Sequence, residues 1–166
     1  MWILRLSKIA VTAAIALFAG LVAFGNLTDY GTNFAFVHHV FLMDTVFEQA
    51  TIKYRAIQTP WIQHVGYVGI IAAETATALL CGWGAARLWR RRNAGAREFN
   101  RGKDVAIAGL SLGFLVWQVA FMSVGGEWFG MWMSKEWNGV PDAFRFFITI
   151  MAVLIYVSRP DTELDT

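Results

Sequence analysis

The stretch from residue 62 to residue 89, IQHVGYVGIIAAETATALLCGWGAARLW, decides the fold. It is almost entirely apolar or small, and Glu74 and Arg87 are its only Asp, Glu, Lys or Arg residues. An α-helix needs about 20 apolar residues to cross the roughly 30 Å hydrocarbon core of a bilayer. We therefore expect this stretch to form a transmembrane helix.

Three further apolar stretches accompany it, over about residues 3–26, 104–125 and 142–158. Hydrophobic residues make up 57% of the 166-residue chain and charged residues only 16%. A soluble core of this size could not bury so many apolar residues, because a small fold leaves much of its surface in water. The sequence predicts an all-α bundle of four transmembrane helices that forms a single membrane domain over residues 1–166.

The basic residues are concentrated on one side of these four spans. Ten are expected there: Arg5, Lys8, Arg87, Arg90, Arg91, Arg92, Arg97, Arg101, Lys103 and Arg159. Four are expected on the other side: Lys53, Arg55, Lys135 and Arg145. The positive-inside rule then places both termini and the loop after the second span in the cytoplasm. This clustering accounts for the net charge of +2 through topology, without a nucleic-acid partner.

The two outer segments, residues 27–61 and 126–141, are too apolar for plain loops. Within residues 33–49, apolar side chains recur at roughly helical spacing, at Val37, Val40, Phe41 and Phe47. Residues 127–137 offer a similar apolar side, formed by Trp128, Met131 and Trp132. We expect short interfacial helices that cap the outer end of the bundle. At the other end, the acidic tail over residues 161–166 is expected to be frayed.

Glu74 lies at the midpoint of the second span, where an ionised carboxylate costs several kcal/mol unless it is paired, hydrated or protonated. A period near 3.5 residues places His64, Tyr67, Thr77 and Cys81 on its side of the helix. In the third span, Ser111 and Gln118 share one face, and the small residues Gly109 and Gly113 allow close helix approach. We expect Glu74 to point into the bundle and to form a hydrogen bond with Gln118 or Ser111.

Two interpretations of Glu74 stay open. It holds two helices together through a polar contact, or it carries protons or anchors a cofactor, quinone or substrate.

The three histidines, His38, His39 and His64, are all expected on the outer side, with Asp44 and Glu48 nearby. Imidazole and carboxylate groups suit zinc or copper, but no metal-binding spacing is present. These histidines are therefore weak metal candidates, and a structural or interfacial role is favoured. The single cysteine, Cys81, excludes an internal disulfide and a cysteine-based zinc site. No catalytic residue is predicted, and the cofactor is unknown.

Several short motifs outside the spans resemble those of a known family. They are NLTDYGTNF over residues 26–34, FVHHV over 36–40, MDT over 43–45, GEWF over 126–129 and WNG over 137–139. With the order of the spans, they resemble a bacterial family of small four-span membrane proteins, domain of unknown function 2165. The resemblance covers nearly the whole chain and implies a multi-pass protein of the bacterial inner membrane. It supplies no catalytic residues.

The same resemblance singles out one outer constellation: Asp29, Tyr30, Asn33, His38, His39, Asp44, Thr45 and Glu127. Within it, the side chain of Asp29 or Asn33 is expected to cap the outer helix by accepting its free N–H groups.

Three functions are compatible with these patterns. The first is an accessory subunit or binding module that docks on other membrane protein subunits of a larger complex. The second is a protein that binds a quinone, pigment, lipid or metal through Glu74, Gln118 and the outer histidines. The third is a small subunit of a transporter. Lipid is the partner common to all three.

Overall fold

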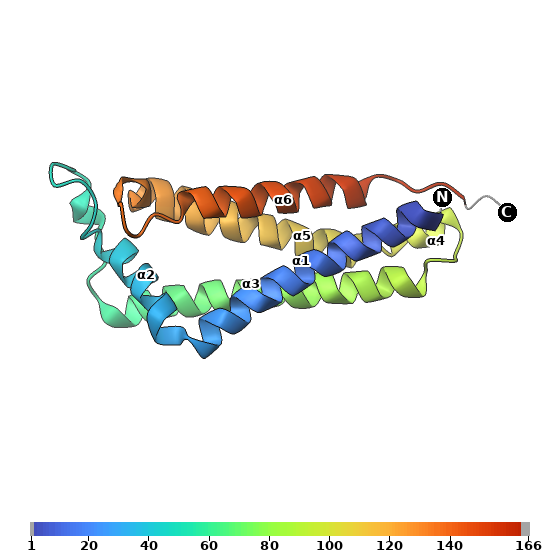
Figure 1. Ribbon diagram of the computed structural model, residues 1–166, viewed down its shortest axis with the longest axis horizontal. Coiled ribbons are helices and arrows are strands. Elements are labelled where there is room, and N and C mark those ends of the chain that lie inside the picture. Colours follow the sequence, from blue (N-terminus) through green and yellow to red (C-terminus); the bar gives the residue numbers. More distant parts are fainter. Residues whose placement is uncertain (1, 164–166) are drawn as a thin grey trace.

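The computed structural model describes residues 2–163, and four long apolar helices run along most of its length (Figure 1). They are α1 (Trp2–Thr28), α3 (Pro60–Arg90), α5 (Asp104–Leu115) continued by η2 (Val116–Trp128), and α6 (Val140–Ser158). Each is long and apolar enough to cross a membrane. The predicted all-α bundle with four membrane-spanning helices is confirmed, and each span extends slightly beyond at least one of its expected ends.

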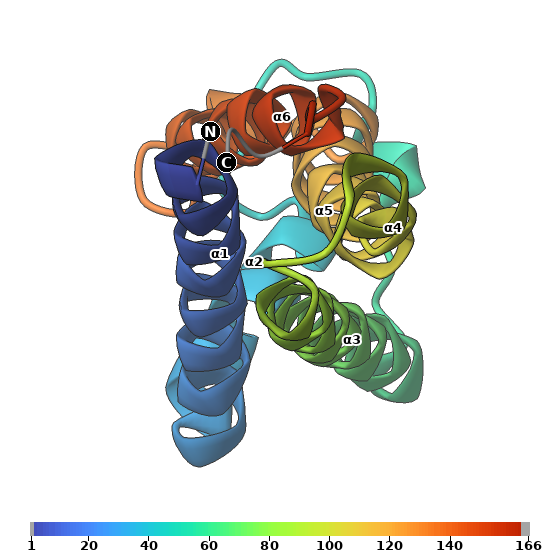
Figure 2. The same ribbon diagram turned by 90° about the vertical axis from the view of Figure 1, so that its right-hand side faces the viewer.

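The four spans are arranged in a ring, with α1 next to α3, α3 next to α5, and α5 next to α6 (Figure 2). Small residues set the closest approaches. A Cβ atom added to Gly109 of α5 would lie 2.7 Å from the backbone nitrogen of Cys81, and one added to Gly84 would lie 2.6 Å from the Cα of Ala106. Gly113 makes a similar approach to Thr77. The predicted small-residue face of the third span therefore packs directly against α3.

The third span does not keep α-helical geometry throughout. From Val116 to Trp128 it continues as a π-helix, η2, in which each N–H bonds a carbonyl five residues earlier. The backbone N–H of Phe129 accordingly donates to the carbonyl of Val124 at 3.0 Å. The sequence predicted an ordinary helix here. Segments of π-helix are rare and occur frequently at functional sites.

The Arg-rich end of the bundle holds both ends of the described chain and the short helix α4 (Ala96–Arg101) (Figure 1). Arg5, which is fully buried, donates to the backbone carbonyls of Arg92, Ala94 and Thr162 at 3.0, 2.5 and 3.2 Å. Its guanidinium also lies 4.7 Å from the ring centroid of Phe99. One basic side chain thus joins α1, the α3–α4 loop and the C-terminal segment.

The prediction of a frayed acidic tail is wrong for Asp161. Its carboxylate is buried and accepts hydrogen bonds from Lys8, at 2.7 Å, and from Lys103. These two ammonium groups compensate its burial and hold the segment against α1 and the start of α5. Glu163 adds a hydrogen bond from the Ala96 backbone N–H to its side chain, at 3.0 Å. Residues 164–166 lie outside the described part of the chain.

The opposite end is covered by the outer segments. The helix α2 (Tyr30–Leu42) follows α1 almost without a break, and a turn of 3-10 helix, η1 (Lys53–Arg55), precedes α3. The expected helix within residues 127–137 is reduced to one 3-10 turn, η3 (Met131–Met133). The reason is local: Gly130 adopts a left-handed conformation with φ of 66°, which ends the preceding helix.

Candidate functional site

A polar cavity of about 220 Å³ lies inside the outer half of the bundle. All four spans and α2 contribute to its wall. Its polar lining residues are Asn26 of α1, Asn33 of α2, Tyr67 and Glu74 of α3, and Asp142 of α6. The remaining wall is mainly apolar and includes the ring of Trp117, which is buried against Phe18 and Phe146. Polar groups from distant parts of the chain therefore face one another within an otherwise apolar bundle.

Glu74 is the most buried acidic group of this cavity, with 1% of its surface exposed. Its Oε2 atom accepts a hydrogen bond of 2.8 Å from the Nδ2 of Asn26. The hydroxyl of Tyr67 donates to the backbone and side-chain oxygens of Asn26, both at 3.2 Å. Asn26 thus bridges Glu74 and Tyr67 and orients the carboxylate toward the cavity.

The expected partners of Glu74 are wrong, because within residues 2–163 neither Gln118 nor Ser111 contacts it by a hydrogen bond. Depth explains the difference. The contacts of Gly113 with Thr77 and of Gly109 with Cys81 show that Glu74 lies level with about residue 116. Ser111 is about five residues deeper, or roughly 7 Å at 1.5 Å per residue. Trp117 occupies the inward position at the right level, and Gln118 is absent from the cavity wall.

Two other predicted residues of α3 lie as expected on its buried face. Tyr67 and Thr77 are both buried. The hydroxyl of Thr77, however, donates to the Ala73 carbonyl of its own helix at 2.8 Å, so it is satisfied without a ligand. His64 departs from this face: it is exposed, and Gln63 takes the buried position.

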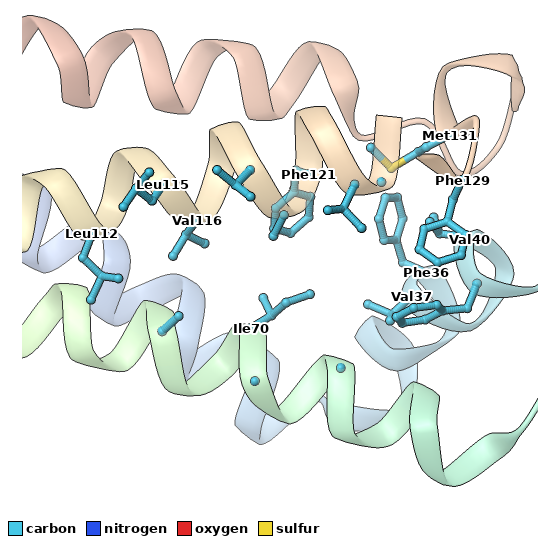
Figure 3. Close-up of a pocket in the computed structure, with 18 residues that line it drawn as sticks. Phe36, Val37, Val40, Ile70, Leu112, Leu115, Val116, Phe121, Phe129 and Met131 are labelled. Carbon is cyan, nitrogen blue, oxygen red and sulfur yellow. The ribbon is translucent and has the colours of Figure 1, made fainter. Parts of the chain in front are cut away.

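An apolar cavity of about 560 Å³ lies beside the polar one, between α2, α3 and the third span (Figure 3). Every one of its 18 lining residues is apolar or glycine. Figure 3 shows Phe36, Val37 and Val40 at its outer end, with Leu112 and Leu115 at the other. Cavities of about 300–1,000 Å³ are typical of small-molecule sites in proteins.

The outer histidines form three separate pairs. The Nδ1 of His38 lies 2.7 Å from the side-chain oxygen of Gln63, and the Nδ1 of His64 lies 2.8 Å from the hydroxyl of Tyr30. The Nδ1 of His39 lies 2.7 Å from the Asp44 carboxylate, and its ring stacks on Trp137. In the described part of the chain, no three His, Cys, Asp or Glu side chains gather as a possible metal site.

The proposed single outer constellation is therefore divided. Asp29 stands at the N-cap position of α2, but its side chain makes no capping bond. The cap is unnecessary in part because α1 continues into α2: the Asp29 N–H donates to the Gly25 carbonyl at 2.9 Å. The side chain of Asn33 instead donates to the Asp29 carbonyl at 3.0 Å. Glu127 is exposed.

Thr45 belongs to a different contact, in which its hydroxyl donates to the Oγ of Ser134 at 2.8 Å. The backbone N–H of Trp137 donates to the same oxygen, also at 2.8 Å. Ser134 thus ties the segment after η3 to the end of α2.

Sequence reasoning missed three residues that shape this region: Asn26, Gln63 and Asp142. Gln63 is fully buried and bridges His38 and the backbone carbonyl of Ile57, to which its Nε2 donates at 2.6 Å. Asn26 and Gln63 are amides at the ends of apolar spans, and a polar amide in such a position was the sequence feature that could have identified them. Asp142 lies in the first turn of α6 and forms an ion pair with Arg145. No sequence feature other than its charge pointed to a place in the cavity wall.

Comparison with known proteins gives one result. The model of a family described as predicted small integral membrane proteins, domain of unknown function 2165, matches residues 4–160. No curated protein and no solved structure matches the chain.

Proposed function

We propose that this chain, which belongs to that family of small integral membrane proteins, binds a small molecule through the Glu74 carboxylate inside the membrane. One observation carries the proposal. Glu74 is almost completely buried, yet it lines a cavity to which all four spans contribute. In place of Gln118 or Ser111, the expected partners within the chain, the Glu74 side chain meets a cavity with room for a ligand.

The hydrogen bonding of Glu74 supports a ligand with a donor group. Asn26 donates to Oε2, and within residues 2–163 no group donates to Oε1. Because Glu74 is only 1% exposed, its carboxylate has little access to bulk water, and a carboxylate oxygen without a donor in such surroundings is costly. A hydroxyl, amine or protonated ring nitrogen of a ligand would supply the missing bond. Asn33 and the Tyr67 ring, on the same wall, would contact the rest of its polar part.

The test is to extract the protein with its surrounding lipid in polymer-bounded nanodiscs and to identify the retained small molecules by mass spectrometry. We expect one molecule at fixed stoichiometry from the natural protein. Losing a hydrogen bond to a charged group costs about 1.5–3 kcal/mol, so Glu74→Ala should weaken retention by about 10- to 100-fold.

Glu98→Gln is the matched control, since Glu98 is exposed on α4, far from the cavity. Retention in Glu98→Gln should equal that of the natural protein. A molecule retained equally by Glu74→Ala, or no specifically retained molecule at all, would contradict the proposal.

A second candidate function is an accessory subunit of a larger membrane complex. It is favoured by large exposed aromatic side chains on the outer segments and the adjoining ends of spans: Phe47, Tyr54, Trp61, Trp128 and Trp132. Such rings are enriched at protein–protein interfaces, and also at the bilayer surface. Mild extraction followed by mass spectrometry of co-purifying proteins distinguishes the two, because only a subunit brings a partner at fixed stoichiometry. The transporter-subunit alternative stays a prediction from size and topology.

The distribution of Lys and Arg residues between the two ends of the bundle supports a location and an orientation. We infer an inner-membrane protein of bacteria whose Arg-rich end, with both termini, faces the cytoplasm. The support is the ten-to-four distribution of basic residues between the two ends.

A further inference from the structure

We propose that the ligand is an amphiphile whose hydrocarbon chain occupies the apolar cavity between α2, α3 and η2. This inference rests on the proposed function, in which Glu74 binds the polar group of the same molecule. It names the class of ligand: a long-chain molecule with a hydrogen-bond donor at its head.

The two cavities are neighbours that share a wall. Four residues line both of them: Phe36, Val37, Ile70 and Phe121. The apolar cavity and the cavity lined by Glu74 therefore meet at these four side chains. Phe36, Ile70 and Phe121 are only partly buried, and each can change rotamer without moving a helix backbone. A polar head and an apolar chain therefore have adjoining places of matching chemistry.

Small residues keep the apolar cavity open on its α3 side. Gly66, Gly69 and Ala73 line it from this helix. Gly69 is itself exposed, and a Cβ atom added to it would meet no other atom within 4 Å, so the cavity opens toward the membrane in front of this glycine. Any larger side chain at position 69 would project into that space and displace an occupant.

The opposite side is formed largely by the π-helical segment. Val116, Val119, Ala120, Phe121, Val124 and Gly125 of η2 line the cavity. At the outer end, α2 and the residues around η3 lie across it, as Figure 3 shows for Phe36, Val40, Phe129 and Met131. The cavity opens toward the membrane along one side, where its lining residues Leu115, Val119 and Val124 are exposed, but α2 and the residues around η3 close its outer end. A transmembrane helix of a partner protein, about 10–12 Å across, needs a groove that is open along its whole length. A single flexible chain needs no such groove, and hydrocarbon chains are abundant in the membrane that this protein spans.

The experiment uses a long-chain primary alcohol with a photoreactive diazirine near the end of its chain, applied to the full-length protein in nanodiscs. After illumination, the labelled residues are mapped by mass spectrometry. We expect labelling to concentrate in residues 66–73 and 112–125. The same chain with a carboxylate head is the second probe, and its labelling should be at least tenfold lower, because a carboxylate has no hydrogen-bond donor to offer to the Glu74 side chain.

Two variants test the placement of the chain. Gly69→Leu should lower labelling by the alcohol probe at least tenfold, and Gly69→Ala should have a smaller effect. Gly31→Leu is the matched control, because an added Cβ at Gly31 also meets nothing within 4 Å but Gly31 lies outside both cavities. Circular dichroism and the thermal midpoint establish that each variant is folded.

The outcomes separate this inference from the proposed function. If Gly69→Leu leaves the labelling unchanged, or if exposed lipid-facing residues such as Leu17 and Leu21 are labelled equally, the chain is not in the cavity and the inference is wrong. The proposed function would still stand if a molecule is retained in a Glu74-dependent way. If Glu74→Ala retains the same molecules as the natural protein, the proposed function is wrong, and the inference that rests on it is wrong as well.

Discussion

The amide of Asn26, at the end of α1, donates a 2.8 Å hydrogen bond to the carboxylate of Glu74, at the middle of α3. The two residues are 48 positions apart in the chain and come from neighbouring antiparallel helices. Their contact fixes the orientation of the one acidic side chain that lies deep in the bundle. It also joins the two helices that pack together most extensively, α1 and α3.

This contact should be measurable as a coupling energy. Interhelical hydrogen bonds in membrane proteins are worth about 0.6 kcal/mol on average and up to about 1.7 kcal/mol. We expect a double-mutant cycle of Asn26→Ala and Glu74→Ala to give a coupling in this range, measured from unfolding in detergent. Tyr67→Phe is the control for the other bonds of Asn26 and should leave the coupling in place. A coupling near zero would show that the bond contributes nothing to stability.

The partner of Glu74 was predicted wrongly because the register of α1 against α3 is seen only in the structure. The contacts of Gly20 with Ala78 and of Ala16 with Gly82 show that each step up α1 is matched by one step back along α3. Carrying this register outward places Glu74 level with about residue 24, two positions from Asn26, which its side chain reaches. Hydropathy gives the spans but not their relative depth. The third span was therefore assigned as the source of the partner, although the first span supplied it.

Other features could not be predicted because they depend on segments far apart in the chain. Asp161 is 153 residues from Lys8 and 58 from Lys103, and an acidic tail read alone is typical of a disordered end. The π-helical geometry of η2 has no sequence signature comparable to a hydrophobic period. By contrast, Gly109 and Gly113 were recognised as a packing face because small residues at helical spacing have a direct steric meaning.

The close approach at Gly109 predicts a steric cost. A Cβ atom there would lie 2.7 Å from the Cys81 backbone nitrogen, and backbone cannot move aside as a side chain can. We expect Gly109→Ala to lower the free energy of unfolding by about 1–3 kcal/mol, the usual cost of overpacking. Gly31→Ala should be neutral or stabilising, since the added methyl group meets open space. Equal stability of the two variants would mean that α3 and α5 are not in close contact.

The buried carboxylate of Asp161 predicts a pH dependence of stability. Burial alone would raise its pKa, but hydrogen bonds and charge from Lys103 and Lys8 outweigh burial and hold the pKa below the usual value. The folded state therefore binds this proton less readily than the unfolded state. The stabilisation is fully present above the unfolded pKa, near about 4, and is lost as the pH falls through the folded pKa.

We expect the thermal midpoint of the natural protein in detergent to fall as the pH is lowered below about 4. The same decrease should be smaller in Asp161→Asn. At neutral pH, Asp161→Ala should cost about 3–5 kcal/mol, because it leaves the ammonium groups of Lys8 and Lys103 buried without a counter-ion. Asp29→Asn, at an exposed position of the opposite end, is the control and should change neither property. Parallel pH profiles for natural protein and Asp161→Asn would rule out the stabilising role.

The orientation of the bundle in the membrane can be measured with introduced cysteines, because the chain has a single native cysteine. Cys81 is fully buried against α5, so Cys81→Ala gives a background without thiols and removes little volume. On this background, Glu48→Cys places an exposed thiol at the outer end, and Glu98→Cys places one on α4 at the Arg-rich end. A membrane-impermeant maleimide should label Glu48→Cys in cells with a permeabilised outer membrane and an intact inner membrane. It should label Glu98→Cys only after the inner membrane is also opened, because the distribution of basic residues predicts that the Arg-rich end faces the cytoplasm. The reverse labelling pattern would invert the topology and place the mouth of the Glu74 cavity toward the cytoplasm.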